Sequence, residues 1–298
     1  MMKKKKKSGK IIIMAKWDSV NSLKGKKRDF SLNNNIEKIP NRVQKKIENV
    51  TVDIFCGFAE EYVKLLENES IHLIVTSPPY NCGVKYDIHN DRMDFTEYKK
   101  WLIHVFSLLK SKLVSGGKVA INFPIVAKIE NKRKILLSIF EHILINSGYD
   151  IIDCIVWVKA RDEKEALGVA GRSTAWGSWM SPTSPYARPI SEFVLIAKKD
   201  GKRILKNKSD ITKEEFLTAT MSNWFIPSKS DSSHPAVFPP ELPERIIKLY
   251  TAVGENVIDP FMGVGNTMVA CLKTKRNFFG SEISSNYISK ALEKLNEF

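Results

Sequence analysis

The sequence predicts an α/β protein with a doubly wound, mostly parallel sheet, and three observations lead to this fold class. Strand-like apolar runs alternate with segments of helical periodicity along most of the chain. Residues 71–76 form an almost continuous apolar run, which is typical of a strand buried on both faces of a parallel sheet. Residues 151–159 and 192–198 are two later strand-like runs that suit an antiparallel pair.

The first half of the chain predicts three strand and helix pairs. Helices are expected where apolar residues recur at intervals of three and four, and glycines after two of these segments favour helix ends there. In order, we expect a strand at 50–55, a helix at 59–66, a strand at 71–76, a helix at 95–113, a strand at 118–122 and a helix at 132–145.

The second half begins with the antiparallel pair, whose strands are separated by a long loop rich in Gly, Ser, Pro and Trp. The pattern weakens at 198–229, which we interpret as a small insert and not as part of the core. After it we expect a helix at 240–250, a strand at 256–259, a helix at 267–273, a strand at 277–281 and a helix at 286–295.

Charge and composition indicate a folded soluble protein with an affinity for polyanions. The formal net charge of the 298 residues is +14, and the first thirty residues hold eleven of the lysines and arginines. We expect residues 1–44 to form a flexible basic arm, since such lysine runs are usually solvated. The remaining positive charge still favours a polyanionic partner over a small anionic substrate.

The cysteines and the apolar segments exclude two further classes of protein. The four cysteines have no C-x-x-C spacing, so the sequence predicts neither a zinc site nor a disulfide framework. No segment approaches the ~18 apolar residues of a membrane span, and the short run after the first lysines is too short for a signal peptide. We therefore expect a cytoplasmic protein with no bound metal and no membrane partner.

The apolar strand at 71–76 ends abruptly in the sequence TSPPY, residues 76–80. A proline-rich stop to a core strand would explain the two prolines, because proline cannot continue a sheet ladder. It would not explain why a hydroxyl precedes the prolines and an aromatic ring follows them. The combination favours a functional site at the end of this strand.

A second motif, DPFMGVG at 259–265, connects a short strand to a helix. Glycines at such a turn let a ligand approach the helix N-terminus. Glu282 follows Gly265 by seventeen positions, at the end of the next strand, where a carboxylate can accept hydrogen bonds from ribose hydroxyls. The missing third glycine argues against NAD and favours a nucleoside cofactor without pyrophosphate. The alternative is a glycine turn made for packing beside a helix-capping Glu282.

Taken together, the two motifs resemble the S-adenosylmethionine-dependent amino methyltransferases of DNA, in the β class with permuted motif order. The resemblance covers the chain from about residue 45 to the end, and it implies a Rossmann-like methyltransferase fold with a circularly permuted motif order. It also implies that S-adenosylmethionine is the cofactor. The residues implied for cofactor binding are Asp259, Phe261, Gly263, Gly265, Asn266, Thr267, Glu282, His234 and Phe238. Family members carry Gly-Asp after the first strand, whereas Phe58 follows Gly57 here, so we assign the adenine contact to Asp53.

The resemblance also implies roles for Ser77, Pro78, Pro79 and Tyr80 as catalytic residues. The Ser77 hydroxyl and the Pro78 carbonyl would accept hydrogen bonds from an exocyclic amine, and the rigid prolines would hold these acceptors in place. Tyr80 would stack on a base flipped out of the duplex. The absence of a Pro-Cys pair excludes, by family pattern, methylation at ring carbon five. Serine at the first position is associated mainly with N4 of cytosine, and N6 of adenine is the alternative.

Recognition of DNA is expected in the loop at 159–189 and in the insert at 198–229. The residues proposed for DNA contacts are Arg172, Trp176, Arg188, Arg203 and Lys229; Trp179 and Trp224 are further aromatic candidates. The expected division is a basic arm at 1–44, a catalytic half at 45–198, a recognition insert at 199–230 and a cofactor-binding half at 231–298.

The expected partners are double-stranded DNA and, as a possibility, a cognate restriction endonuclease; the chain would be a monomer or a homodimer. Two other functions remain open. One is methylation of RNA or of a protein glutamine, although the family patterns for those substrates place the cofactor motif first and begin the catalytic motif with Asn. The other is an inactive DNA-binding subunit, which the intact Ser77, Tyr80, Gly263, Gly265 and Glu282 argue against.

Overall fold

The computed structural model describes residues 11–12, 41–84, 91–171, 177–187, 189–228 and 238–298. Five of the expected site residues lie outside these ranges, and nothing structural is said of them: Arg172, Trp176, Arg188, Lys229 and His234. The expected flexible arm at 1–44 also lies mostly outside them. The described sheet begins before the boundary expected at residue 45, because a strand starts at Arg42.

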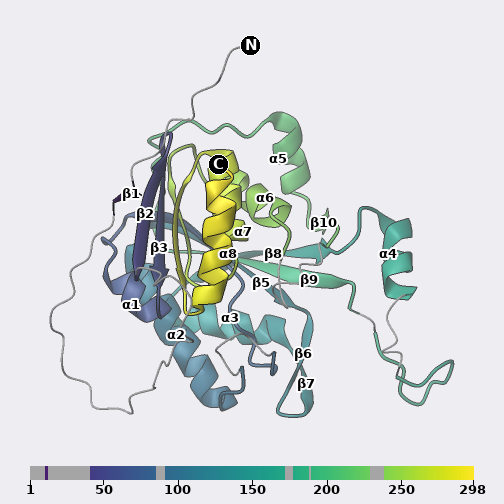
Figure 1. The fold of residues 1–298 in the computed structure, drawn as a ribbon. Helices are drawn as coiled ribbons and strands as arrows, with labels where there is room; N and C mark the ends of the chain where they lie inside the picture. Colours follow the sequence, from purple (N-terminus) through teal and green to yellow (C-terminus); the bar gives the residue numbers. More distant parts are fainter. Residues whose placement is uncertain (1–10, 13–40, 85–90, 172–176, 188, 229–237) are drawn as a thin grey trace.

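A single large sheet forms the centre of the molecule (Figure 1). Its strands lie in the order β1-β2-β3-β12-β11-β4-β5-β9-β8-β10. Neighbours from β3 to β5 are parallel, whereas β9 is antiparallel to both β5 and β8. The strands are β1 (Ile11–Ile12), β2 (Arg42–Ile47), β3 (Val50–Cys56), β4 (Ile71–Thr76), β5 (Leu113–Pro124), β8 (Asp150–Val158), β9 (Ser191–Lys198), β10 (Asn223–Phe225), β11 (Asn256–Asp259) and β12 (Asn277–Glu282). The predicted doubly wound α/β fold is confirmed.

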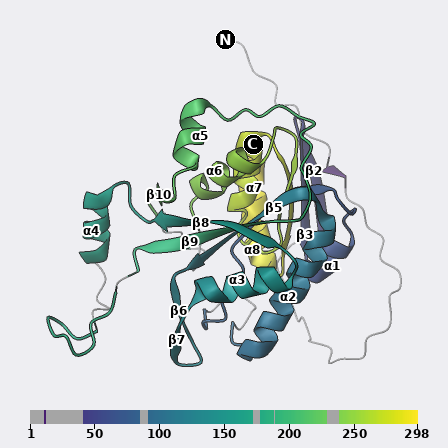
Figure 2. The same cartoon turned by 180° about the vertical axis from the view of Figure 1, so that it is seen from behind.

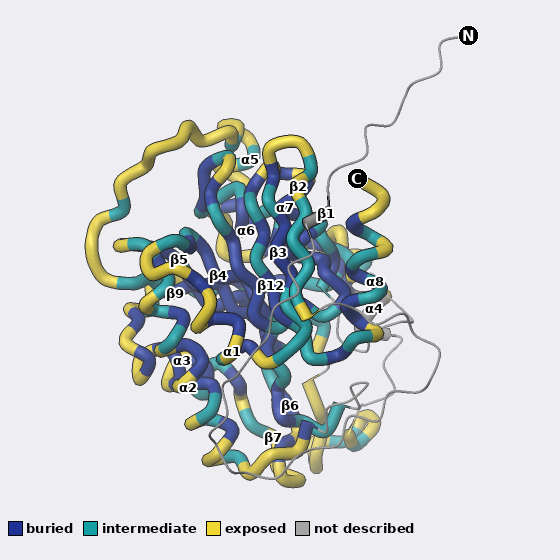
Figure 3. The backbone as a smooth tube through the Cα atoms, turned by 60° about the vertical axis from the view of Figure 1, so that its left-hand side comes forward, coloured by how far each residue is buried: buried dark blue, intermediate teal, exposed yellow. Residues whose placement is uncertain are grey.

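Helices cover both faces of this sheet, as the opposite views in Figures 1 and 2 show. One apolar cluster packs α1 (Ala59–Lys64), α2 (Phe95–Lys112) and α3 (Leu136–Asn146) against one face. A second cluster packs α6 (Glu241–Tyr250), α7 (Asn266–Thr274) and α8 (Ser285–Asn296) against the other. The central strands are therefore buried along most of their length (Figure 3), which explains why 71–76 is apolar on both sides.

The helix predicted at 132–145 begins later than expected. Its first residues belong to a hairpin of β6 (Val126–Ile129) and β7 (Lys132–Ile135), and α3 begins at Leu136. The hairpin turns at Glu130 and Asn131, which both have positive φ, at 50° and 63°. Two such residues make the tight turn whose twist suits a hairpin. Glu130 carries no turn signal of its own, so periodicity alone extended the helix too far.

The predicted insert at 199–230 has two parts that lie in different places in the fold. Helix α5 (Lys213–Ala219) connects them. The last part of the insert contributes β10 to the main sheet, where Trp224 is fully buried beside β8. The interpretation of the whole segment as lying outside the core is therefore wrong. Trp224 packs its ring with the sheet's apolar cluster, as buried tryptophans usually do.

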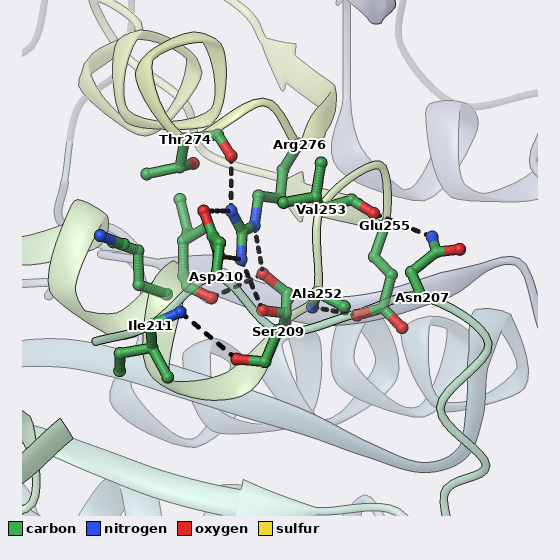
Figure 4. Close-up of polar contacts among 12 residues, drawn as sticks. Asn207, Ser209, Asp210, Ile211, Ala252, Val253, Glu255, Thr274 and Arg276 are labelled. Atoms are coloured by element: carbon green, nitrogen blue, oxygen red, sulfur yellow. Dashed lines mark hydrogen bonds and ion pairs between the residues drawn. The ribbon is translucent and has the colours of Figure 1, made fainter. Parts of the chain in front are cut away.

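The first part of that segment, residues 199–212, is bonded along the edge of the sheet where the parallel strands begin; we call it the strap. Figure 4 shows Arg276, which precedes β12 and is fully buried, pairing with Asp210 of the strap. Two guanidinium nitrogens reach the two carboxylate oxygens of Asp210 at 2.9 and 2.6 Å. Arg203 similarly pairs with Glu255, which precedes β11. These ion pairs hold the strap at the amino edge of the sheet.

A further helix, α4 (Glu163–Gly171), belongs to the long excursion between β8 and β9. This excursion leaves and rejoins the sheet at the end where the parallel strands finish, and it projects away from the body in Figures 1 and 2. Among the residues that the structure describes, no helix is both long and apolar enough to span a bilayer. The same residues contain no cluster of three or more His, Cys, Asp or Glu side chains suited to a metal ion.

The Asp210 to Arg276 ion pair leads to a stability prediction. Replacing Asp210 by Ala leaves the fully buried Arg276 without its charged partner, so we expect the free energy of unfolding to fall by about 2 kcal/mol. Glu214→Ala on the neighbouring helix α5 is the matched control and should change it by less than about 0.5 kcal/mol. Denaturant unfolding measures both, and equal effects of the two substitutions would contradict the role of the pair.

Candidate active site

The two sequence motifs meet at the carboxyl edge of the sheet, where β4 and β11 are parallel neighbours. Leu73 pairs with Val257 and Ile74 with Ile258, so both strands end at the same place. From there, β4 leads through α2 to β5 on one side, and β11 leads through α7 to β12 on the other. This is the point at which the winding of the sheet reverses, where ligands bind in open α/β sheets.

The buried carboxylate of Asp259 joins the two motifs. It accepts hydrogen bonds from the hydroxyls of Thr76, at 2.8 Å, and Thr267, at 2.6 Å, and from the backbone N–H of Phe261, at 3.1 Å. Burial raises the pKa of Asp259 to about 6, and these hydrogen bonds oppose the shift. Asp259 and Thr267 are both expected to bind a cofactor, and the structure shows them in the buried contact between the two motifs.

Ser77, Pro78, Pro79 and Tyr80 follow β4 directly and lie at this edge. The side chains of Ser77 and Tyr80 are hydrogen-bonded to each other through their oxygens. The Pro79 carbonyl accepts a hydrogen bond from the Tyr98 hydroxyl of α2, at 2.8 Å. Two prolines and a bonded carbonyl restrict the backbone, so the Ser77 hydroxyl is held in one place.

Tyr80 is more deeply packed than its expected role in stacking suggests. Its side chain is only 7% exposed, the ring edge meets Phe140, and the hydroxyl donates to the Asn122 carbonyl at 3.2 Å. A stacked base needs a free ring face, which this conformation does not offer. The structure therefore shows Tyr80 packed and hydrogen-bonded to Ser77, and its stacking on a base stays a prediction.

The segment after Tyr80 contains residues that the sequence analysis did not single out. The Asn81 side chain both donates to and accepts from the backbone of Met93, at 2.7 and 2.6 Å. The buried Asp91 carboxylate accepts from the backbone N–H groups of Asn81 and Cys82, at 2.7 and 3.0 Å. Asn81 has φ of 57°, a conformation that asparagine tolerates. An asparagine directly after the prolines and tyrosine was the available signal.

The glycine turn after β11 has the conformation that its residues permit. Gly263 and Gly265 have φ of 51° and 80°, and Gly265 caps α7. A Cβ on Gly265 would lie 3.0 Å from the Cβ of Ala291, so α8 leaves no room for a side chain here. The positive φ of Gly265 also disfavours any other residue. Gly265 thus shapes the fold of the turn, while Gly263 lies beside Glu282.

Glu282 ends β12 and its carboxylate borders the glycine turn. One oxygen accepts from the backbone N–H of Gly263 at 3.0 Å and the other from that of Ser284 at 2.9 Å. Burial raises the pKa of Glu282 to about 7, although these backbone donors oppose the shift. The backbone N–H of Ile283 also bonds this carboxylate, which leaves it one lone pair for a further donor.

Three other expected cofactor residues have contacts of different kinds. Asn266 is buried and bridges two segments, donating to the Phe238 carbonyl and accepting from Lys294 of α8, both at 2.8 Å. Phe238 packs at the margin of an apolar cluster. Phe261 is half-buried, with its ring meeting Trp101 of α2 edge to face at 5.6 Å. Of these three, Phe261 is the residue between Asp259 and the two glycines, and its backbone N–H bonds the Asp259 carboxylate.

Two of the expected site residues are engaged elsewhere. Asp53 is buried within β3, and its carboxylate accepts from Arg42 and Gln44 of β2, so it joins two strands and does not reach the carboxyl edge. At that edge the residue after Gly57 is Phe58, whose ring is 47% exposed. Arg203 lies in the strap at the opposite edge, bonded to Glu255 and to the Tyr250 carbonyl, which removes it from a DNA contact beside Ser77.

The fold and the site define an α/β protein whose carboxyl edge combines a Ser-Pro-Pro-Tyr turn with a glycine turn and an acidic strand end. Residues 71–293 match the N6/N4 methyltransferase family model, described as DNA methylase. The chain therefore belongs to this DNA methylase family, and the resemblance inferred from the two motifs is confirmed.

Relatives of known name agree with this family. The type II methyltransferase M.MjaVI of Methanocaldococcus jannaschii is 36% identical over 170 residues, which cover 55% of this chain and 81% of that protein. The type II methyltransferase M.BglI of Bacillus subtilis is 27% identical over 300 residues, covering 81% and 85%.

Solved structures confirm the methyltransferase fold. The cytosine-N4-specific PvuII DNA methyltransferase has a TM-score of 0.63 at 18% identity, covering 82% of this chain and 86% of that one. A DNA modification methylase from Thermus thermophilus, in complex with S-adenosylmethionine, has a TM-score of 0.62 at 22% identity, covering 82% and 93%.

The raised pKa of Glu282 leads to a pH-dependent stability prediction. The folded protein holds this proton up to about pH 7, compared with an ordinary pKa of 4.5, so the group's favourable contribution is complete below 4.5 and is lost as the pH rises through 7. We expect wild-type stability to fall between pH 4.5 and 8 relative to Glu282→Gln, by about 2 kcal/mol for a carboxyl that solvent partly reaches.

Denaturant unfolding at several pH values measures this difference. Glu293→Gln, which alters an exposed carboxyl of α8, is the control and should run parallel to the wild type. Parallel curves for Glu282→Gln as well would show that Glu282 is not held protonated by the fold.

Proposed function

We propose that this DNA methylase transfers the methyl group of S-adenosylmethionine to an exocyclic amine of a base flipped out of double-stranded DNA, with N4 of cytosine as the acceptor. One observation carries the proposal: the Asp259 carboxylate bonds Thr76 and Thr267, which places the end of the Ser-Pro-Pro-Tyr strand beside the turn of the glycine motif. A methyl donor and an amine acceptor have to meet at such a junction.

The glycine turn and the end of β12 fit the cofactor. S-adenosylmethionine supplies a methyl group on a positively charged sulfur. The ribose hydroxyls would find an acceptor in Glu282, which keeps one lone pair beyond its backbone hydrogen bonds. The turn at Gly263 has no side chain to obstruct them. The exposed ring of Phe58, at the end of β3, is a better candidate than Asp53 for the adenine contact.

Ser77 is suited to accept a hydrogen bond from the amine. The single hydroxyl proton of Tyr80 is donated to the Asn122 carbonyl, so the bond between the two hydroxyls uses the proton of Ser77. The lone pairs of the Ser77 oxygen then remain free for an incoming donor. An amine that donates to Ser77 loses planarity with its ring, and its own lone pair becomes available for methyl transfer. A hydroxyl oriented in advance does not have to turn during the reaction.

The amine of a paired base is hidden inside the duplex, so the base has to leave the stack before it reaches Ser77. The excursion between β8 and β9 starts at the same edge of the sheet and is the proposed recognition segment. Its Trp179 side chain is 64% exposed, unlike the buried Trp224. Within the described residues, recognition by this excursion is thus better supported than recognition by the strap.

The choice of N4 of cytosine follows from the serine at position 77, and the structural neighbour that is cytosine-N4-specific supports it. The names of the relatives as type II methyltransferases further support a role beside a cognate restriction endonuclease, whose sites the methylation would protect.

The first experiment incubates the purified protein with tritiated S-adenosylmethionine and mixed genomic DNA, and then separates the nucleosides of a complete digest. We expect label in N4-methylcytosine, because serine at the first position of the catalytic motif is associated mainly with N4 of cytosine. Label in N6-methyladenine would overturn the assignment of cytosine, but it would still agree with methyl transfer to an exocyclic amine. A protein that binds the cofactor yet leaves DNA unlabelled would overturn the proposed substrate.

The hydroxyl pair of Ser77 and Tyr80 predicts a graded loss of turnover. Ser77→Ala removes the acceptor, so kcat should fall about a hundredfold. Tyr80→Phe keeps the ring but frees the Ser77 hydroxyl to turn, so kcat should fall about tenfold, the equivalent of one neutral hydrogen bond.

Calorimetry should find an unchanged cofactor affinity in both variants, since neither side chain belongs to the glycine turn. Ser138→Ala on α3 is the control for loss of a serine hydroxyl. Equal kcat values for Tyr80→Phe and the wild type would remove the orienting role of the Tyr80 hydroxyl.

A further inference from the structure

A groove of about 430 Å³ lies beside the Ser-Pro-Pro-Tyr turn, and the proposed methyl transfer does not use it. One wall is the segment that directly follows Tyr80 together with the residues that clamp it. The other wall is the hairpin of β6 and β7. The lining residues include Cys82, Gly83, Arg92, Met93, Lys128 and Asn131.

Two cations lie opposite each other on the hairpin, an arrangement that destabilises the strand pair. Lys128 pairs directly with Arg133 across the two strands, so both side chains lie on the same face, and both are exposed. Directly opposed like charges destabilise a strand pair. Lys132 pairs with Ile129, so its side chain belongs to the other face of the hairpin, and it is also exposed. Among the described residues, no carboxylate pairs with Lys128 or Lys132. A polyanion bound to the face of Lys128 and Arg133 would neutralise the repulsion.

The hairpin is held firmly in its position. Ala127 and Ile129 are buried beneath it, at 7% and 1% exposure. The ammonium of Lys134 lies 3.6 Å from the centre of the Phe95 ring and pairs with Glu130. These contacts fix the face that carries Lys128 and Arg133.

The hairpin is also connected to the proposed recognition segment. The guanidinium of Arg133 lies over the ring of Tyr186, at 4.7 Å from its centre, and Tyr186 belongs to the excursion between β8 and β9. A molecule that contacts this excursion and the catalytic turn therefore passes the hairpin.

The opposite wall adds a cation close to the catalytic turn. The Arg92 side chain lies directly over Gly83, where an added Cβ would come within 2.9 Å of its Nε. Two acids, Asp94 and Glu130, also line the groove, but both are engaged: Asp94 caps α2 and Glu130 pairs with Lys134. The nearby Asp91 accepts from the backbone after Tyr80. The free charge facing the groove is thus mainly positive.

We propose that this groove and the exposed cations of the hairpin beside it bind the sugar-phosphate backbone of the DNA strand that carries the flipped base. Lys128 and Arg92 line the groove on opposite sides, and Lys132 and Arg133 belong to the hairpin that forms one of its walls. The proposal rests on the proposed function, since it assumes a DNA substrate. The groove continues from Tyr80 through Gly83, so a strand that delivers its base to Ser77 has its next phosphates at the groove. Neutralising phosphates requires cations and no base-specific donors, which agrees with the lysines and arginines found there.

The test measures DNA affinity as a function of salt for the full-length protein with its cofactor. The triple variant Lys128→Gln, Lys132→Gln, Arg133→Gln should bind DNA more weakly at low salt. The slope of log affinity against log salt should become shallower by about 0.9 for each phosphate that the variant no longer neutralises. The KM for DNA should rise in parallel, while the cofactor affinity and the thermal unfolding midpoint stay at wild-type values.

Two control variants test whether the effect depends on where the cations lie and on their charge. Lys202→Gln, Lys206→Gln, Lys208→Gln removes three exposed cations from the strap at the opposite edge and should leave the slope unchanged. Lys128→Arg, Lys132→Arg, Arg133→Lys keeps the charge of the hairpin and should restore the slope. Equal slopes for the hairpin and strap variants would overturn the proposed role of the groove. This outcome would leave the proposed function standing as long as the wild-type protein methylates DNA. A wild-type protein that labels no DNA would instead overturn the proposed function.

Discussion

The buried carboxylate of Asp259 is the contact on which the site depends. It connects Thr76, at the end of one strand and 183 residues before Asp259, to Thr267, in the helix that follows the neighbouring strand. Burying a carboxyl group is unfavourable, as the rise of its pKa to about 6 shows, and three hydrogen bonds offset that cost. A shift of either strand would leave this group unsatisfied, so the carboxylate restricts the two motifs to one relative position.

The two edges of the sheet have different tasks. The carboxyl edge combines the Ser-Pro-Pro-Tyr turn, the glycine turn and the start of the projecting excursion, so every group with proposed chemistry lies there. The amino edge is closed by ion pairs between the strap and the residues that precede β11 and β12, above all by Arg276 with Asp210. β9 ends at the amino edge, and the strap that follows it stays at this edge. β10, parallel to β8, then leads the chain to the carboxyl edge, so the strap does not obstruct the site.

Charge and chemistry are also separated within the carboxyl edge. The proposed acceptor, Ser77, is a neutral hydroxyl oriented by a second hydroxyl and a backbone carbonyl, and the acids nearby are largely buried. The exposed cations lie further out, on the hairpin and beside Gly83. Positive charge there attracts a polyanion over distances of about 10 Å, whereas the choice of an amine is made by hydrogen bonds at contact distance.

The sequence by itself determined the fold class, most of the strands of the parallel sheet and both motifs, because hydrophobic periodicity and turn residues are local properties. Residues 71–76, 256–259 and 277–281 were found almost to the residue. Local patterns also mislead: the helix predicted at 132–145 includes β7, the second strand of the hairpin. The insert predicted at 199–230 includes β10, because three residues carry little periodicity.

Only the tertiary structure decided which polar residues face one another. Asp53, Asp91, Arg203 and Asp259 are equally polar in the sequence, yet Asp53 joins two strands, Arg203 fastens the strap, Asp91 clamps the turn after Tyr80, and Asp259 holds the two motifs together. The partner of a side chain depends on strand order and register, which arise from burial of the whole sheet. For that reason the motifs could be found in the sequence, whereas the groove beside them could not.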